Sequence, residues 1–153
     1  MNTQEAYTKA CEYLMQAEGR SGIADCPPGG GDAFVCLYAG PDDRACGVGC
    51  LLPRELAARL DTASGSSVSP SWGAVLRNPE EFPAYTEAAE YLKGVSNDML
   101  YHLQGIHDSR LAWEHGKGEM KRRLHKLARD FGLTAPECLG PDLWATCDDE
   151  GGP

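Results

Sequence analysis

Apolar residues recur at three- and four-residue intervals in several parts of this chain, a spacing that places them on one face of an α-helix. Such a spacing predicts a helix over residues 3–18, a short helix after Pro53, and a helix over 79–92 whose regular part follows Pro83. It also predicts a buried helix from Ser96 to Asp108, with Ser96 as its N-cap. The pattern is mainly that of a helical protein.

A last helical segment is predicted over 109–131, although Gly116 and Gly118 weaken its first half. After Gly132, a typical residue at a helix C-terminus, residues 134–153 contain several prolines and glycines, no basic residue and a run of three acids. We therefore expect a single globular domain over 1–133, followed by an acidic, largely unstructured C-terminal tail.

One region has the pattern of β-structure instead. Residues 33–38 are rich in β-forming side chains, residues 40–43 have turn chemistry, and residues 44–48 can return as the partner strand. These features predict a β-hairpin. The expected fold class is accordingly α+β, a mostly helical single domain packed around one β-hairpin.

Length and hydropathy limit what the chain can be. It has 153 residues, of which 42% are hydrophobic, enough to close one core. No stretch reaches the roughly 20 apolar residues that cross a bilayer, and the first twenty residues mix polar side chains among apolar ones, unlike a signal peptide. We expect a cytoplasmic protein with no membrane partner.

The net charge of −9 is unevenly distributed. Residues 1–108 hold 7 basic and 15 acidic side chains, residues 109–131 hold 7 and 3, and residues 132–153 hold 0 and 5. A chain this acidic is repelled by phosphate backbones, so we expect no general nucleic-acid binding unless the basic segment is presented apart from the rest. The basic segment, with Lys121 and Arg122, can still bind a small anion, unless the acidic tail folds against it.

Seven cysteines offer two kinds of chemistry. A zinc site could use Cys26, Cys36, Cys46 and Cys50, but only the last two are close in sequence, whereas structural zinc sites usually have two close pairs. Packing of Cys36 against Cys46 across the hairpin is the simpler interpretation. We therefore expect no metal and no cofactor, with reduced thiols.

A catalytic alternative pairs a cysteine with a histidine. Cys50 precedes the helix that starts at Pro53, where a helix N-terminus can lower a thiol pKa, and His107 with Asp108 could supply the base and the group that orients it. Cys46 is the other candidate nucleophile. A structural role for His107, through one buried hydrogen bond near a helix end, explains the same residues. No phosphate-loop pattern is present.

Two stretches carry a resemblance to known proteins. Cys36-Leu-Tyr-Ala-Gly-Pro-Asp-Asp-Arg-Ala-Cys-Gly-Val-Gly-Cys-Leu-Leu-Pro53 and Leu103-Gln-Gly-Ile-His-Asp108 resemble a family of small proteins encoded by bacteriophages and prophages. The resemblance covers roughly residues 5 to 133. It implies that the two stretches pack together, and that Tyr38, Arg44, His107 and Asp108 share a surface.

The resemblance also implies a function by analogy. We expect a non-enzymatic phage accessory protein in the host cytoplasm, which inhibits a host protein or sequesters a nucleotide-like defence signal. Its expected ligand-binding residues are Tyr38, Arg44, His107, Asp108, Lys121 and Arg122. Capture of a small molecule would favour a homo-oligomer. A Cys–His hydrolase or transferase and a zinc-stabilised interaction module are the alternatives.

Overall fold

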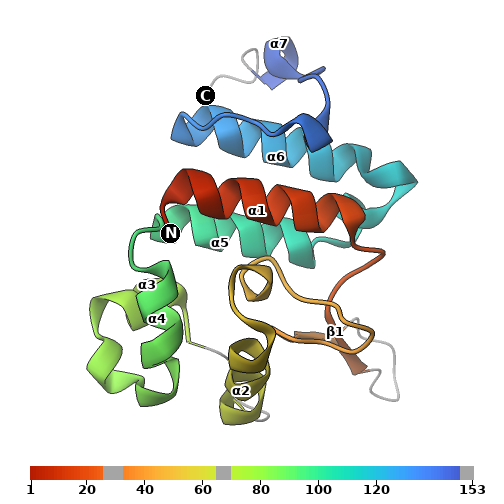
Figure 1. The fold of residues 1–153 in the computed structure, drawn as a ribbon. Helices are drawn as coiled ribbons and strands as arrows, with labels where there is room; N and C mark the ends of the chain where they lie inside the picture. The colour runs from red at the N-terminus through yellow and green to blue at the C-terminus, as the bar shows by residue number, and fades with distance from the viewer. Residues whose placement is uncertain (26–32, 65–69, 149–153) are drawn as a thin grey trace.

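A computed structural model describes residues 1–25, 33–64 and 70–148, and three of its helices lie together (Figure 1). Helix α1 (Thr3–Gln16) lies beside α5 (Asn97–Asp108), and α6 (Gly118–Phe131) packs on α5. Their buried side chains form much of one continuous core. Among them are Tyr7, Leu14, Met99, Leu103, Met120 and Leu124.

Shorter helices close the other end of the molecule. These are α2 (Arg54–Ser64), α3 (Trp72–Arg77) and α4 (Thr86–Leu92), with α3 against α5. The helix predicted over 79–92 is interrupted, because Pro79–Glu81 and Pro83–Tyr85 are separate 3-10 turns before α4 begins. The helix predicted from Ser96 to Asp108 is confirmed, and the Ser96 side chain accepts a hydrogen bond from the backbone N–H of Met99.

The predicted β-hairpin is wrong. Strand β2 (Ala33–Cys36) pairs antiparallel with the upstream strand β1 (Gly22–Asp25), with Gly22 opposite Cys36. Residues 44–48, predicted as the partner strand, pair with the segment after β2 only through an isolated bridge between Ala39 and Ala45. The expected α+β class, with a core built around a hairpin, is therefore wrong as well, because helices form most of the core and two four-residue strands lie beside it.

Two glycines let residues 46–51 pack tightly against neighbouring backbone without joining the sheet. A Cβ atom on Gly47 would lie 2.6 Å from the carbonyl oxygen of Leu103, and one on Gly49 would lie 2.1 Å from that of Tyr38. Gly47 therefore rests directly on the backbone of α5, and Gly49 rests on the backbone just after β2, where a 3-10 turn spans Gly49–Leu51. Contact with a helix replaces pairing with β2.

The connection between α5 and α6 is also not helical throughout. A 3-10 turn over Arg110–Trp113 is followed by three residues with positive φ, His115, Gly116 and Lys117. This turn brings the Lys117 ammonium group onto the carbonyl oxygens of Leu14, Met15 and Ala17, at the C-terminus of α1. A cation at this end of a helix satisfies carbonyls that have no partner within the helix.

The predicted domain boundary at residue 133 does not separate an unstructured tail. The side chain of Gln4 accepts from the backbone N–H of Thr134 and donates to its carbonyl oxygen. Leu139, in the 3-10 turn Glu137–Leu139, is buried against α1 and α6, and α7 spans Ala145–Asp148. Residues 134–148 thus belong to the same packed body.

The close approach of Gly49 gives a direct test of this packing. Gly49→Ala should lower the free energy of unfolding by about 2 kcal/mol or more, because backbone rather than a flexible side chain blocks the added methyl group. Gly118→Ala is the matched control, since its Cβ would meet nothing within 4 Å. Urea unfolding of both variants measures the difference, and equal stability of the two would contradict this packing.

Candidate functional site

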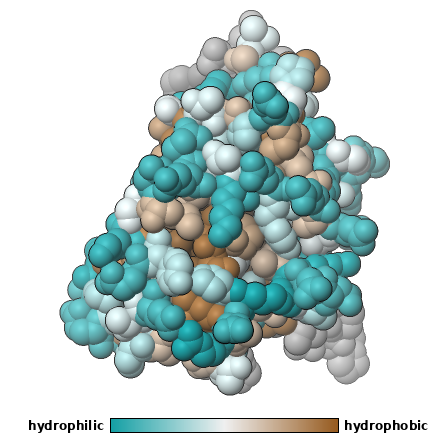
Figure 2. All heavy atoms as spheres, in the orientation of Figure 1, coloured by the Kyte–Doolittle hydropathy of each residue, from teal (hydrophilic) through white to brown (hydrophobic). Residues whose placement is uncertain are grey.

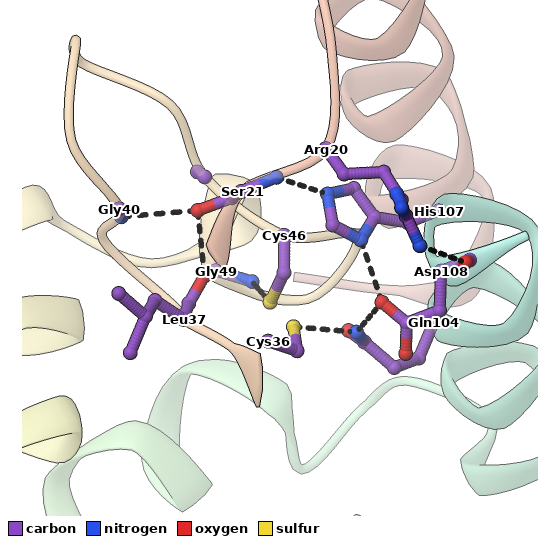
Figure 3. A network of polar contacts seen from close by, with 12 residues as sticks. Arg20, Ser21, Cys36, Leu37, Gly40, Cys46, Gly49, Gln104, His107 and Asp108 are labelled. Carbon is purple, nitrogen blue, oxygen red and sulfur yellow. Dashed lines mark hydrogen bonds and ion pairs between the residues drawn. The ribbon is translucent and has the colours of Figure 1, made fainter. Parts of the chain in front are cut away.

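The centre of the candidate site is the imidazole of His107, which is fully buried near the C-terminus of α5. Its Nε2 accepts a hydrogen bond of 3.0 Å from the backbone N–H of Ser21, and its Nδ1 lies 2.8 Å from Oδ1 of Asp108 (Figure 3). The ring also packs edge-on against Trp113, whose indole N–H donates to the carbonyl of His107. Both ring nitrogens are therefore occupied.

These two partners determine the protonation of the ring. A backbone N–H can only donate, so Nε2 must present a lone pair to Ser21. The proton of the neutral ring is then on Nδ1, from which it is donated to Asp108. In this tautomer His107 has no free lone pair with which to accept a proton from a substrate.

Ser21 extends the network to the segment after β2. Its hydroxyl donates to the carbonyl of Leu37 at 2.8 Å and accepts from the backbone N–H of Gly40 at 3.0 Å. On the neighbouring residue, the Arg20 guanidinium donates to the carbonyl of Asp108. The network thus joins the chain after α1, the chain after β2 and the end of α5, which is how the structure brings together the two stretches that carry the resemblance.

Gln104 links this network to a cysteine. Its side-chain N–H groups donate to Cys36 Sγ and to Asp108 Oδ1, both at 2.9 Å. The remaining amide oxygen, Oε1, is buried and has no hydrogen-bond partner within the described residues. Figure 3 shows the Cys36 sulfur lying between Gln104 and the sulfur of Cys46.

Cys36, His107 and Asp108 are close enough to be considered as metal ligands. One ligand atom from each lies within 4.8 Å of the others. A histidine that binds a metal through Nδ1 carries its proton on Nε2 and donates it to an acceptor. Here Nε2 faces the Ser21 N–H, a donor, so the ring is arranged for its bond to Asp108 and does not fit a metal.

The predicted zinc ligands are only partly brought together. The thiols of Cys36 and Cys46 are hydrogen-bonded to each other. Cys50 instead donates to the carbonyl of Gly47, and Cys26 lies outside the described residues. The packing of Cys36 against Cys46 was therefore anticipated correctly, although not across a hairpin.

The predicted Cys50–His107 pair does not form a catalytic dyad, because both ring nitrogens of His107 have other partners. Burial raises the pKa of the Cys50 thiol to about 12, against a smaller opposing effect of Lys9. The hydrogen bond that Cys36 donates to Cys46, together with burial, raises the pKa of Cys36 as well, against a smaller opposing effect of His107. Little of either thiol is ionised at neutral pH, so neither suits fast nucleophilic catalysis.

Two other predicted ligand-binding residues are used structurally. Tyr38 is buried and packs edge-on against Trp72, and its backbone N–H donates to Asp61. Arg44 donates to the carbonyl of Arg20. Tyr38, Arg44, His107 and Asp108 consequently do not form one exposed surface.

The basic face of α6 is largely neutralised by neighbouring carboxylates. Glu119 accepts hydrogen bonds from both Arg122 and Arg123, and its pKa falls to about 2, mainly through Arg122. Lys126 pairs with Asp130 at 2.7 Å. Arg129 binds Asp142, as expected if the acidic tail folds against this helix. Lys121 is half-buried on the same helix.

A groove of about 570 Å³ lies between α5 and α6. Asp108 and Gln104 lie at this groove, so it adjoins the buried network, whereas His107, Lys121 and Arg122 do not line it. Tyr101, one of its residues, is 77% exposed. The lining residues are Tyr101, His102, Gln104, Gly105, Ile106, Asp108, Arg123, Lys126, Leu127 and Asp130.

Sequence reasoning missed Ser21, Gln104 and most of the groove. Gln104 was part of the motif that carries the resemblance, and its i, i+4 spacing to Asp108 was visible. Ser21 meets His107 through its backbone N–H, which every residue but proline has, and its hydroxyl bonds only to backbone groups, so no sequence signal distinguishes it. The groove depends on which faces of α5 and α6 meet.

No family model, curated protein or solved structure matches this chain. None of the helices in the described parts of the chain is both long and apolar enough to cross a bilayer. Figure 2 shows one face of the molecule covered mostly by hydrophilic residues, with hydrophobic residues reaching the surface near its middle.

The buried histidine should be important for stability. His107→Ala removes the acceptor of the Ser21 N–H and leaves a cavity, so we expect a loss of about 2 kcal/mol or more in urea unfolding. His102→Ala, exposed on the same helix, is the control and should change stability by less than about 0.5 kcal/mol. Nitrogen NMR of the wild type should show a protonated Nδ1 and a bare Nε2 on His107; the reverse tautomer would contradict this network.

The lowered pKa of Glu119 predicts that the stability of the fold depends on pH. Its pKa in the folded protein is below that of the unfolded chain, so its contribution is complete above about pH 4.5 and is lost as the pH falls towards 2. We expect Glu119→Gln to destabilise the protein at pH 7 by about 1 kcal/mol and to have little effect near pH 2. Glu90→Gln, which breaks an exposed pair with Lys93, is the control. Thermal unfolding at both pH values tests this, and a pH-independent effect would contradict it.

Proposed function

We propose that this protein is a phage accessory protein that binds and inhibits a host protein in the host cytoplasm, and that the α5–α6 groove is its binding site. The phage origin rests on the resemblance of residues 36–53 and 103–108. The observation that carries the binding site is Tyr101, a large aromatic side chain that is 77% exposed at the edge of the groove.

An exposed tyrosine beside an apolar floor is typical of a protein interface. Ile106 and Leu127 line the groove and are almost fully buried, which gives it an apolar base. Tyrosine is enriched among the residues that dominate binding energy, because it buries a large area with few rotatable bonds. A partner side chain that fills the groove would also cover the ring of Tyr101.

The charges around the groove support a protein partner more than a nucleotide. Arg123 and Lys126 line it, but Glu119 and Asp130 neutralise them, and Asp108 adds a further carboxylate. A phosphate group would face Asp108 and Asp130 as well as the two cations. A polypeptide, with donors and acceptors of both signs, suits this lining better.

The same geometry supports binding over catalysis by a Cys–His hydrolase or transferase. The thiols of Cys36 and Cys50 have raised pKa values, and His107 has its accepting nitrogen occupied by Ser21. A Cys–His hydrolase would need a thiolate and a base free to take its proton.

Site-specific photocrosslinking in bacterial cells tests the proposal. A photoreactive phenylalanine analogue replaces Tyr101 in one variant and Tyr91, which is exposed on α4 away from the groove, in the other. We expect one host protein to be crosslinked at position 101 and not at 91. With that protein purified, Tyr101→Ala should raise the Kd at least tenfold and Tyr91→Ala should not, measured by calorimetry.

Three results would contradict the proposal. Crosslinking of a second copy of this chain at position 101 would make the groove an oligomer interface. Equal crosslinking at positions 101 and 91 would remove the evidence for this groove. A phosphate-bearing small molecule seen in native mass spectra, and lost with Arg123→Gln, would favour capture of a nucleotide-like signal.

A further inference from the structure

The thiols of Cys36 and Cys46 form a contact that the proposed function does not use. Cys46 is fully buried, and its sulfur accepts a hydrogen bond of 3.2 Å from the backbone N–H of Gly49. Cys36 is only partly buried, and its thiol is hydrogen-bonded to that of Cys46. In Figure 3 the two sulfurs point toward each other, from the end of β2 and from the segment that rests on α5.

We propose that Cys36 and Cys46 are a redox-active pair, which a hydroperoxide converts to a disulfide and a dithiol reductant restores. The pair differs from the other described cysteines, because Cys11, Cys50 and Cys138 have no thiol hydrogen bond to another cysteine among the described residues. Cys36 is partly exposed and so can meet a peroxide, and Cys46 is buried beside it, where it can attack the oxidised Cys36 sulfur.

The reaction proceeds in two balanced steps. In the first, the Cys36 sulfur attacks one oxygen of hydrogen peroxide, the O–O bond breaks, and a sulfenic acid and one water are formed. In the second, the Cys46 sulfur attacks the Cys36 sulfur, the S–O bond breaks, and the hydroxide takes up the Cys46 proton and leaves as water. Two thiols are thereby oxidised to one disulfide, and one peroxide is reduced to two waters.

The rate should be low. The contact with Cys46 and burial both raise the pKa of Cys36, so little thiolate is present at neutral pH. In a reducing cytosol the pair therefore rests as two thiols, and the disulfide accumulates only under oxidative stress.

The pair is connected to the groove through Gln104. This side chain lines the groove and donates to Cys36 Sγ. The Cys36 sulfur lies between Gln104 and Cys46, so bonding to Cys46 draws it away from the amide. Oxidation should consequently free one N–H of Gln104. Only the effect of this change on partner binding rests on the proposed function; the disulfide itself does not.

Mass spectrometry of the full chain tests the disulfide. After peroxide treatment, acid quenching and alkylation of the remaining thiols, we expect a peptide map that links Cys36 to Cys46. Cys46→Ala should instead stop at a Cys36 sulfenic acid, which a dimedone probe traps, whereas Cys50→Ala should form the disulfide like the wild type. Circular dichroism of both variants confirms that they are folded.

A second readout follows the Gln104 side-chain amide by NMR. Its signals should shift on oxidation of the wild type and remain in place in peroxide-treated Cys46→Ala. A linkage between any other two cysteines, two thiols that stay reduced in the folded chain, or bound zinc that protects both thiols would overturn the proposal. A disulfide without any change in the Gln104 signals would refute the connection to the groove alone.

Discussion

The fold depends on a buried imidazole whose two nitrogens have fixed and opposite roles. Nε2 of His107 accepts from the Ser21 backbone, and Nδ1 donates to Asp108, so one ring connects the chain after α1 to the end of α5. Since buried polar groups cost free energy unless they are satisfied, this arrangement tolerates few alternatives. It specifies where the segment 20–21 meets the helix, and Ser21 transmits that position to Leu37 and Gly40.

The same hydrogen bonds make the role of this cluster structural and not catalytic. A cysteine, a histidine and an aspartate lie together, which in another arrangement would indicate a catalytic triad or a metal site. This region is not such a site, because the backbone N–H of Ser21 points at Nε2 of His107, the nitrogen that catalysis would need. The exposed edge of the network, formed by Gln104 and Asp108, is the part that faces the groove. A rigid interior thus supports a surface that can bind.

The helices were predictable from sequence because their signal is local. The spacing of Met99, Leu100, Leu103 and Ile106, with Ser96 as N-cap, specifies α5 almost to the residue. The hairpin prediction was wrong because the sequence of a strand does not specify which other segment it pairs with. Residues 33–38 have β-forming side chains whichever partner they take. Gly47, which rests on the backbone of α5, and Gly49, which rests on the backbone of Tyr38, look in sequence like ordinary turn glycines. His107 and Asp108 could be predicted as a pair because they are adjacent in the chain. Ser21, the other partner of His107, is 86 residues away and could not be predicted.

The turn at residues 115–117 has a consequence for how the molecule opens. Lys117 holds three carbonyl groups at the end of α1 while its own residue begins α6, so the fraying of either helix end removes support from the other. Arginine is a poor replacement, since its flat fork cannot converge on three oxygens as a tetrahedral ammonium group does. The last turn of α1 and the first turn of α6 should therefore exchange their amide hydrogens as one cooperative unit, although about a hundred residues separate them.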